Sequence, residues 1–376
     1  MQRTMTKTSE YRFFNLPRKY TDEDYETALN KITTSYSKIN NVLAIYSFAG
    51  KFVPGISDMD LIFVHKKNPK KLPLLKRGFY FLDKKTRYLA RHPFFHIYED
   101  DFEKLNYIYP KSQYEKLFGK ELKIRNISAS EENLVRISLF NDIIIRHYPR
   151  DFLQQHIKKK INVRDTLLRL NSLKYSAKFI TEITKTRISG IESLLKRVGG
   201  LRENWFELED YEELADLHES ALNITMEFIR VFDEFLLSEE LVNIESEESI
   251  NYLGQKNQSE FCKDWESNKS LKEMGALARN GKLTSILPLS LAPQIIGYSR
   301  NKGLISSYIK KNLEGEINYK SKLTEIAAKR ISILNGQAEL AQRTLHSDFA
   351  AFFDFGYSSN FGVNNRTINL IKGITR

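Results

Sequence analysis

The sequence has little cysteine and no long apolar run, and both absences exclude classes of protein. Cys262 is the single cysteine in 376 residues, which excludes an internal disulfide framework and a cysteine zinc site. The most apolar window, 286–298, is interrupted by Pro288 and Pro293 and is too short to span a bilayer. None of the seven histidines forms a His-x-x-x-His pair on a predicted helix, so a histidine metal site has no support.

The composition is that of a folded chain. It is 41% hydrophobic and 28% charged, and its length is sufficient for two domains with full cores. Its first residues include Arg3 and Lys7 but no apolar segment, so we expect no secretory signal and a cytoplasmic location. The net charge of +11 suggests an anionic partner, although widely spread lysines are also typical of an ordinary soluble surface.

Patterns along the chain predict an α+β protein with two parts. Apolar, β-favouring runs predict strands over 42–47, 61–65 and 93–98, which form a short mixed sheet in an α/β domain over 1–125. An all-α domain is predicted over 126–376, with a polar loop over 240–270 and with Gly199-Gly200 ending one helix. Helical periodicity or capping signals predict helices over 22–40, 72–91, 163–185, 188–198, 211–239, 271–291 and 320–349, and a helix that Ser128 caps.

The most informative segment is the loop that joins the first two predicted strands. An apolar run ends near Ser47, a loop with glycines at 50 and 55 follows, and Asp58 and Asp60 open the next strand. Side chains alternate along a strand, so these two aspartates point to the same face. Mg²⁺ is held in proteins by one or two carboxylates together with the phosphates of its substrate. The spacing therefore predicts a magnesium site at the start of this strand.

This segment resembles the DNA-polymerase-β-like nucleotidyltransferase superfamily, which has a Gly-Ser turn after its first strand and Asp-x-Asp at the start of the second. The sequence Ser57-Asp58-Met59-Asp60-Leu61 matches the family's Ser-Asp-x-Asp-Leu segment, and Ser47 stands at the family's serine. Tyr46 replaces the usual glycine of the turn. The segment Glu115–Leu122 is similar to the one that closes the catalytic domain in several of these families, although Gly119 also fits an ordinary helix C-cap.

The resemblance implies a nucleotidyltransferase fold, followed by a helical domain, and a Mg²⁺-dependent enzyme. Such an enzyme transfers a nucleoside monophosphate from a nucleoside triphosphate, such as ATP, to an acceptor that the sequence does not identify. The resemblance makes Asp58 and Asp60 the catalytic residues and the Mg²⁺ ligands. It implies that the nucleotide is bound by four residues of the loop: Ser47, Gly50, Lys51 and Ser57.

The family's third carboxylate, on the next catalytic strand, has no clear counterpart. The run 93–98 contains no acid, and the acidic cluster Glu99-Asp100-Asp101 that follows fits the first turn of a helix. His96 is a candidate substrate contact or base, although a buried strand histidine explains it as well. The missing acid and the altered turn leave a second reading open, in which the protein is a catalytically silent nucleotidyltransferase-like binding or regulatory protein.

A cluster of lysines and arginines, from Lys66 to Arg77, could guide a polyanion, with aromatic residues at 79–81 as stacking platforms. The sequence carries no known nucleic-acid-binding motif, and a charged loop is most often simply solvated. We therefore expect nucleic acid to be a less favoured partner than a nucleotide.

Overall fold

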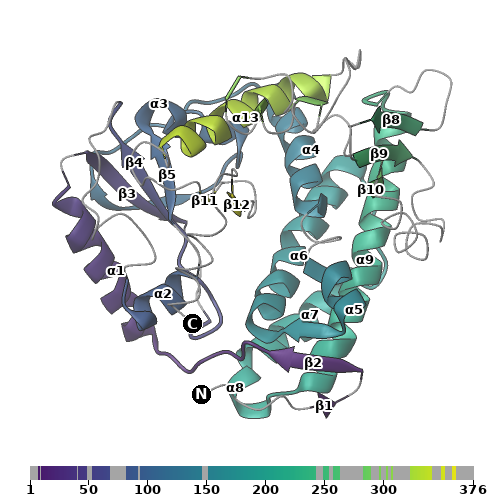
Figure 1. The fold of residues 1–376 in the computed structure, drawn as a ribbon, viewed down its shortest axis with the longest axis horizontal. Helices are drawn as coiled ribbons and strands as arrows, with labels where there is room; N and C mark the ends of the chain where they lie inside the picture. Colours follow the sequence, from purple (N-terminus) through teal and green to yellow (C-terminus); the bar gives the residue numbers. More distant parts are fainter. Residues whose placement is uncertain are drawn as a thin grey trace.

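A computed structural model of the chain places a small sheet and a helical bundle side by side (Figure 1). This arrangement confirms a mixed α and β fold. The structure describes residues 7–8, 10–39, 41–48, 53–67, 82–91, 94–145, 151–242, 249–253, 257–262, 283–288, 296–297, 302–303, 306–307, 322–340, 349–351 and 358–360.

The sheet beside the bundle has four strands in the order β5-β4-β3-β6. Its strands are β3 (Val42–Phe48), β4 (Leu61–His65), β5 (Phe95–Tyr98) and β6 (Tyr114–Gly119). β3 pairs antiparallel with β4 and with β6, and β4 pairs parallel with β5, so the sheet is mixed as predicted. The segment that resembles the end of the family's catalytic domain thus contains an edge strand of this sheet.

Both faces of this sheet are covered by helices. α1 (Asp22–Ser37) and α2 (Lys84–Ala90) cover the face that carries Leu61 and Phe63. α3 (Glu99–Phe102), the short 3-10 helix η3 (Leu105–Tyr107) and α13 (Lys322–Leu340) cover the face that carries Ile62 and Val64. In Figure 1, α13 (yellow-green) lies across the top of the sheet and also packs against the bundle.

The bundle is built on four long helices whose apolar faces form the largest core cluster. Its helices are α4 (Ala129–Ile145), α5 (Gln154–Lys158), α6 (Val163–Thr184), α7 (Ile191–Glu203), α8 (Trp205–Leu208) and α9 (Tyr211–Ser238). Trp205 and Phe232 are almost fully buried in this core. The predicted apolar stripes are therefore core positions.

Three smaller sheets complete the described structure. The first joins the N-terminal arm to the bundle through β1 (Lys7–Thr8), β2 (Tyr11–Phe14) and β7 (Lys160–Asn162). The second contains β8 (Ser249–Leu253), β9 (Asn257–Cys262) and β10 (Leu283–Pro288). The third pairs β11 (Phe349–Ala351) with β12 (Ser358–Asn360).

The predicted helix starts are confirmed where a capping residue marks them. Thr21 caps α1: its side chain accepts from the backbone N–H of Asp24, and the Asp24 side chain accepts from the Thr21 N–H. Ser128 and Glu131 form the same reciprocal pair at the start of α4. Local hydrogen bonds fix these starts, so the sequence is sufficient to predict them.

The predicted stop at Gly199-Gly200 is wrong, because α7 continues to Glu203. The apolar stripe of this helix extends past the two glycines to Leu201, which is 5% exposed in the bundle core. Each glycine costs a helix about 1 kcal/mol relative to alanine. Burying a leucine contributes about 1.5–3 kcal/mol, so tertiary packing outweighs the local preference.

The chain over 126–376 also differs from the expected all-α domain, because β7 lies between α5 and α6 of the bundle and β8 to β12 lie after α9. The segment 283–288, predicted as helix, is β10, and the loop predicted over 240–270 contains β8 and β9. A short apolar run bounded by proline fits a strand as well as a helix. Pairing with β9, which only the fold supplies, decides between them.

Candidate functional site

Asp58 and Asp60 lie at the entrance to β4, where the ladder with β3 begins. The Phe48 N–H donates to the Asp60 carbonyl at 3.3 Å, and the Met59 N–H donates to the Leu89 carbonyl at 3.0 Å. Met59, between the two aspartates, is 1% exposed and packs in the core under α1 and α2. Both aspartates are half-buried. Asp60 directly precedes Leu61 of β4, so strand alternation places it on the face opposite Leu61, and Asp58 reaches Arg91 at the end of α2.

The turn before Asp58 is held by hydrogen bonds from distant residues. Gly55 has φ +79°, and a Cβ placed there would lie 2.0 Å from the Arg18 carbonyl oxygen, so only glycine fits. The Tyr25 hydroxyl accepts from the Gly55 N–H at 3.1 Å and donates to the Ser57 carbonyl at 2.7 Å. The Ser57 Oγ accepts from the Val53 N–H at 2.8 Å, so this predicted nucleotide-binding hydroxyl closes the turn.

Arg164 of α6 connects the bundle to the same turn. Its guanidinium donates to the carbonyls of Ile56, Ser57 and Tyr88 at 3.1, 3.0 and 2.6 Å. It also lies 3.8 Å from the centroid of the Tyr88 ring. Arg164 thus ties α6 of the bundle both to the turn before Asp58 and to α2 on the sheet.

Arg91, at the end of α2, joins Asp58 to the first turn of α6. Its Nη1 is 3.3 Å from Asp58 Oδ2, and its Nε is 2.9 Å from Asp165 Oδ1. Burial lowers the pKa of Arg91, but the carboxylates of Asp165 and Asp58 outweigh burial and raise it above the usual value. The guanidinium therefore stays charged and neutralises part of the acidic charge at the site.

A second arginine, Arg202 of α7, lies close enough to Asp58 to interact with it electrostatically. Burial lowers the pKa of this guanidinium, and the Asp58 carboxylate acts in the opposite direction. Arg202 is 7% exposed, and its Nε has no hydrogen-bond partner among the described residues. A buried guanidinium with an unmet donor is costly unless an anion pairs with it.

The loop residues predicted to bind nucleotide are only partly described. Ser47 is 9% exposed and stands opposite Leu61 in the β3–β4 register, so it shares the face of Leu61. Asp60 lies on the other face, and strand alternation thus separates Ser47 from it. Gly50 and Lys51 lie outside the described residues.

His96 lies inside the protein, away from the aspartates. It is 5% exposed, its Nδ1 is 2.9 Å from His65 Nε2, and its ring stacks on Phe63 at 5.3 Å between centroids. Burial lowers the pKa of His96 to about 4, so the ring is neutral at pH 7. The structure therefore places it in the core, as a strand histidine with a histidine partner.

The acidic cluster after β5 forms the first turn of α3, as the helix interpretation predicted. Each carboxylate has a lysine partner: Glu99 with Lys120, Asp100 with Lys67, and Asp101 with Lys104. The acid brought towards Asp58 is instead Asp165, which shares Arg91 with it. No sequence signal links Asp165, Arg91, Arg164 or Arg202 to the aspartates, because only the packing of α2, α6 and α7 brings them there.

The donor chemistry at Asp58 and Asp60 fits Mg²⁺ bound together with a triphosphate, which needs one or two carboxylates. Arg91 already engages one oxygen of Asp58, so Mg²⁺ would compete with that ion pair. Within the part of the chain that the structure describes, no group of three or more His, Cys, Asp or Glu residues has metal-binding geometry. The carboxylates here would thus need substrate phosphates as further ligands.

Comparison with known proteins gives no relative from which to transfer a function: no protein-family model, curated protein or solved structure matches the chain. Among the described helices, none has both the length and the apolar character needed to cross a bilayer. The functional argument therefore depends on the site itself.

Proposed function

We propose that this protein is a Mg²⁺-dependent nucleotidyltransferase, which transfers a nucleoside monophosphate from a nucleoside triphosphate to an acceptor. The observation that carries the proposal is the two carboxylates of Asp58 and Asp60 after a turn that Tyr25 and Arg164 hold in place, with the buried Arg202 within electrostatic range of Asp58. A complex of Mg²⁺ with a triphosphate needs carboxylates to bind the metal and cationic donors to bind the phosphates. The two aspartates and the Arg202 guanidinium would supply them.

In the proposed site, the acidic residues bind the metal and the basic residues bind the phosphates. Asp58 and Asp60 would hold Mg²⁺, which when bound neutralises the phosphates and polarises their oxygens. Arg202 would pair with a phosphate oxygen, because its Nε lacks a partner among the described residues. Gly50 and Lys51 keep the triphosphate-binding roles that the resemblance implies, whereas Ser47 lies on the face opposite Asp60 and the Ser57 hydroxyl supports the turn.

The alternative is a catalytically silent, nucleotidyltransferase-like binding protein, and one contact favours it. Arg91 already lies 3.3 Å from Asp58, where it supplies the positive charge that a metal would bring. The strand β5, Phe95–Tyr98, also carries no acid to complete a catalytic set. In this reading the nucleotide binds through the arginines and no transfer follows.

Nucleotide titration with and without Mg²⁺ separates the two readings. Without the metal, the two carboxylates repel a triphosphate, so Mg²⁺ should tighten ATP binding in the wild type. Asp60→Asn should remove this enhancement while leaving the fold intact. Asp100→Asn is the matched control, because Asp100 is an exposed acid paired with Lys67 and should leave the enhancement unchanged.

Transfer is tested separately, with α-labelled nucleotide and a panel of acceptors. Mg²⁺-dependent labelling that Asp60→Asn abolishes would support the enzyme. Arg202→Gln should weaken ATP binding about tenfold or more, because a hydrogen bond to a charged group contributes about 1.5–3 kcal/mol. Equal ATP affinity with and without Mg²⁺, in the wild type and in Asp60→Asn, would exclude the enzyme and leave the silent protein.

A further inference from the structure

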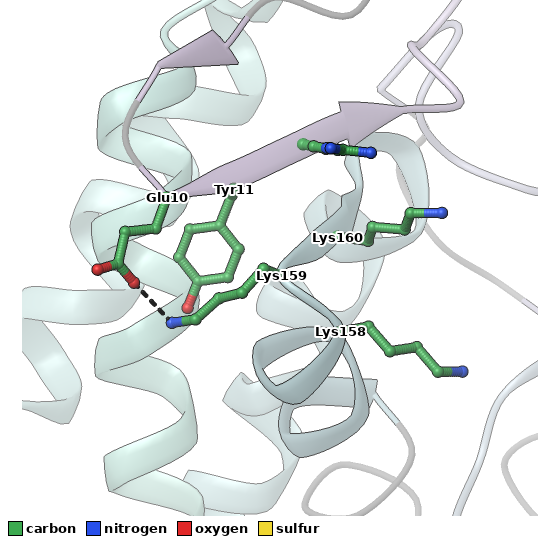
Figure 2. Close-up of a pocket in the computed structure, with 6 residues that line it drawn as sticks. Glu10, Tyr11, Lys158, Lys159 and Lys160 are labelled. Atoms are coloured by element: carbon green, nitrogen blue, oxygen red, sulfur yellow. Dashed lines mark ion pairs between the residues drawn. The ribbon is translucent and has the colours of Figure 1, made fainter.

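The small sheet β1-β2-β7 and the adjoining end of α5 carry a row of exposed cations. Tyr11 and Phe13 of β2 are each 2% exposed and point into the bundle, so Arg12 and Phe14 point outward. Arg12 stands opposite Lys160 in the β2–β7 register, which places both side chains on the same face. Lys158 precedes Lys160 by two residues, and Figure 2 shows both lysines extending to the same side.

These three cations, here called the basic row, differ from the lysine between them. Lys159 Nζ lies 2.8 Å from a Glu10 carboxylate oxygen and 4.9 Å from the centroid of the Tyr11 ring, so its charge is compensated (Figure 2). Within the described residues, Arg12, Lys158 and Lys160 make no ion pair. All three are exposed. Like charges directly opposite each other weaken a sheet, so an anion that bound here would relieve the repulsion.

The surface around the basic row suits an extended polyanion. Together with Tyr11, Lys159 and Glu10, the row lines a pocket of about 330 Å³. Arg12 and Lys160 lie on adjacent strands, which are about 5 Å apart, and Lys158 ends α5 immediately before β7. Several cations side by side can bind successive phosphates of an extended polyanion, whereas a single cation binds one. Phe14, 42% exposed, offers an aromatic face on the same side of the sheet.

A continuous set of hydrogen bonds leads from the end of β2 to Asp58. Asn15 donates to Asn162 at 2.8 Å, Asn162 donates to Asp165 at 3.0 Å, and Arg91 joins Asp165 to Asp58. These contacts link the strand that carries Arg12 and Phe14 to the candidate site.

We propose that the basic row and Phe14 bind single-stranded nucleic acid, with the cations on the phosphates and the phenylalanine against a base. The choice of a single strand follows from Phe14, because an exposed ring stacks on a base that is already unstacked. A lipid surface would use the same cations but gains little from one ring on a flat sheet. This inference concerns binding alone and does not depend on the transferase proposal.

The test is fluorescence anisotropy with a labelled single-stranded oligonucleotide of mixed sequence, titrated with the full chain at several salt concentrations. Three phosphate contacts give a logarithmic salt slope of about −2, which is about 20-fold weaker binding at 200 mM than at 50 mM salt. The triple variant Arg12→Gln/Lys158→Gln/Lys160→Gln should lose this part of the slope. Phe14→Ala should weaken binding about fivefold or more at every salt concentration.

The matched control removes three exposed cations near the other end of α6, through Lys178→Gln, Arg187→Gln and Lys196→Gln. It changes the net charge equally and should keep most of the affinity and slope. Equal losses in both triple variants would overturn the proposal, because net charge alone would then explain the binding. Binding to phosphatidylserine vesicles without binding to the oligonucleotide would also overturn it, and would assign the row to a lipid headgroup.

Discussion

Replacing Arg164 by methionine should loosen the turn that presents Asp58. Arg164 is 3% exposed, and its guanidinium donates to the carbonyls of Ile56, Ser57 and Tyr88. Methionine keeps much of the side-chain volume but donates nothing, so the substitution tests the hydrogen bonds with little change in packing.

The expected cost follows from the carbonyls left without this donor. The Ser57 carbonyl still accepts from the Tyr25 hydroxyl at 2.7 Å, so the loss falls mainly on Ile56 and Tyr88. A buried carbonyl that loses its donor costs about 1–3 kcal/mol, so the two together cost about 2–6 kcal/mol. The lower figure corresponds to about 30-fold more frequent opening of the turn.

Hydrogen exchange followed by mass spectrometry measures this opening directly, in peptides that cover 53–60. These amides should exchange at least about 30-fold faster in Arg164→Met, while those in the middle of α9 should change less. Arg187→Met, an exposed arginine after α6, is the control and should change stability by less than about 0.5 kcal/mol. Unchanged exchange over 53–60 would refute the claim that Arg164 holds the turn.

Two further predictions concern stability. Gly119→Ala should destabilise by about 1–3 kcal/mol or more, because Gly119 has φ +84° and an added Cβ would lie 2.0 Å from the Leu43 carbonyl oxygen. Gly199→Ala in α7 should instead stabilise by about 0.5–1 kcal/mol, and chemical unfolding of the two variants compares these opposite signs. The stability of the fold should also depend on pH, because burial lowers the pKa of His96 to about 4. The contribution of this neutral ring to the free energy of unfolding is complete above pH 6.5 and is lost as the pH falls towards 4. His96 should account for about 2 kcal/mol of the stability lost between pH 7.5 and pH 5, so the loss should be smaller by about that amount in His96→Gln, and an unchanged loss would contradict this origin.

Local signals in the sequence were sufficient wherever the decisive interactions are close along the chain. Thr21 and Ser128 mark helix starts because each bonds to a backbone N–H three residues away. β4 matches its predicted bounds because the apolar run Leu61–Val64 favours a strand. The acidic first turn of α3 was identified from the helix dipole alone. The placement of Asp58 and Asp60 at the entrance to β4 follows from the same local pattern.

Contacts between distant segments decided the rest. α13 covers a face of the sheet because Ile62 and Val64 need an apolar neighbour, but nothing within the strands specifies which helix supplies it. The sequence around His96 does not show whether the side chain faces a ligand or the core. Its hydrogen bond with His65 places it in the core.

The sequence by itself determined that two carboxylates open a buried strand after a glycine-containing turn, since side-chain alternation needs only neighbouring residues. Only the tertiary structure decided what surrounds them. Arg91 reaches Asp58 from the end of α2, which packs on the sheet, and Asp165 and Arg202 come from the bundle helices α6 and α7. Their charges set the electrostatic environment of Asp58, and electrostatic interactions depend on distance in space rather than on separation along the chain.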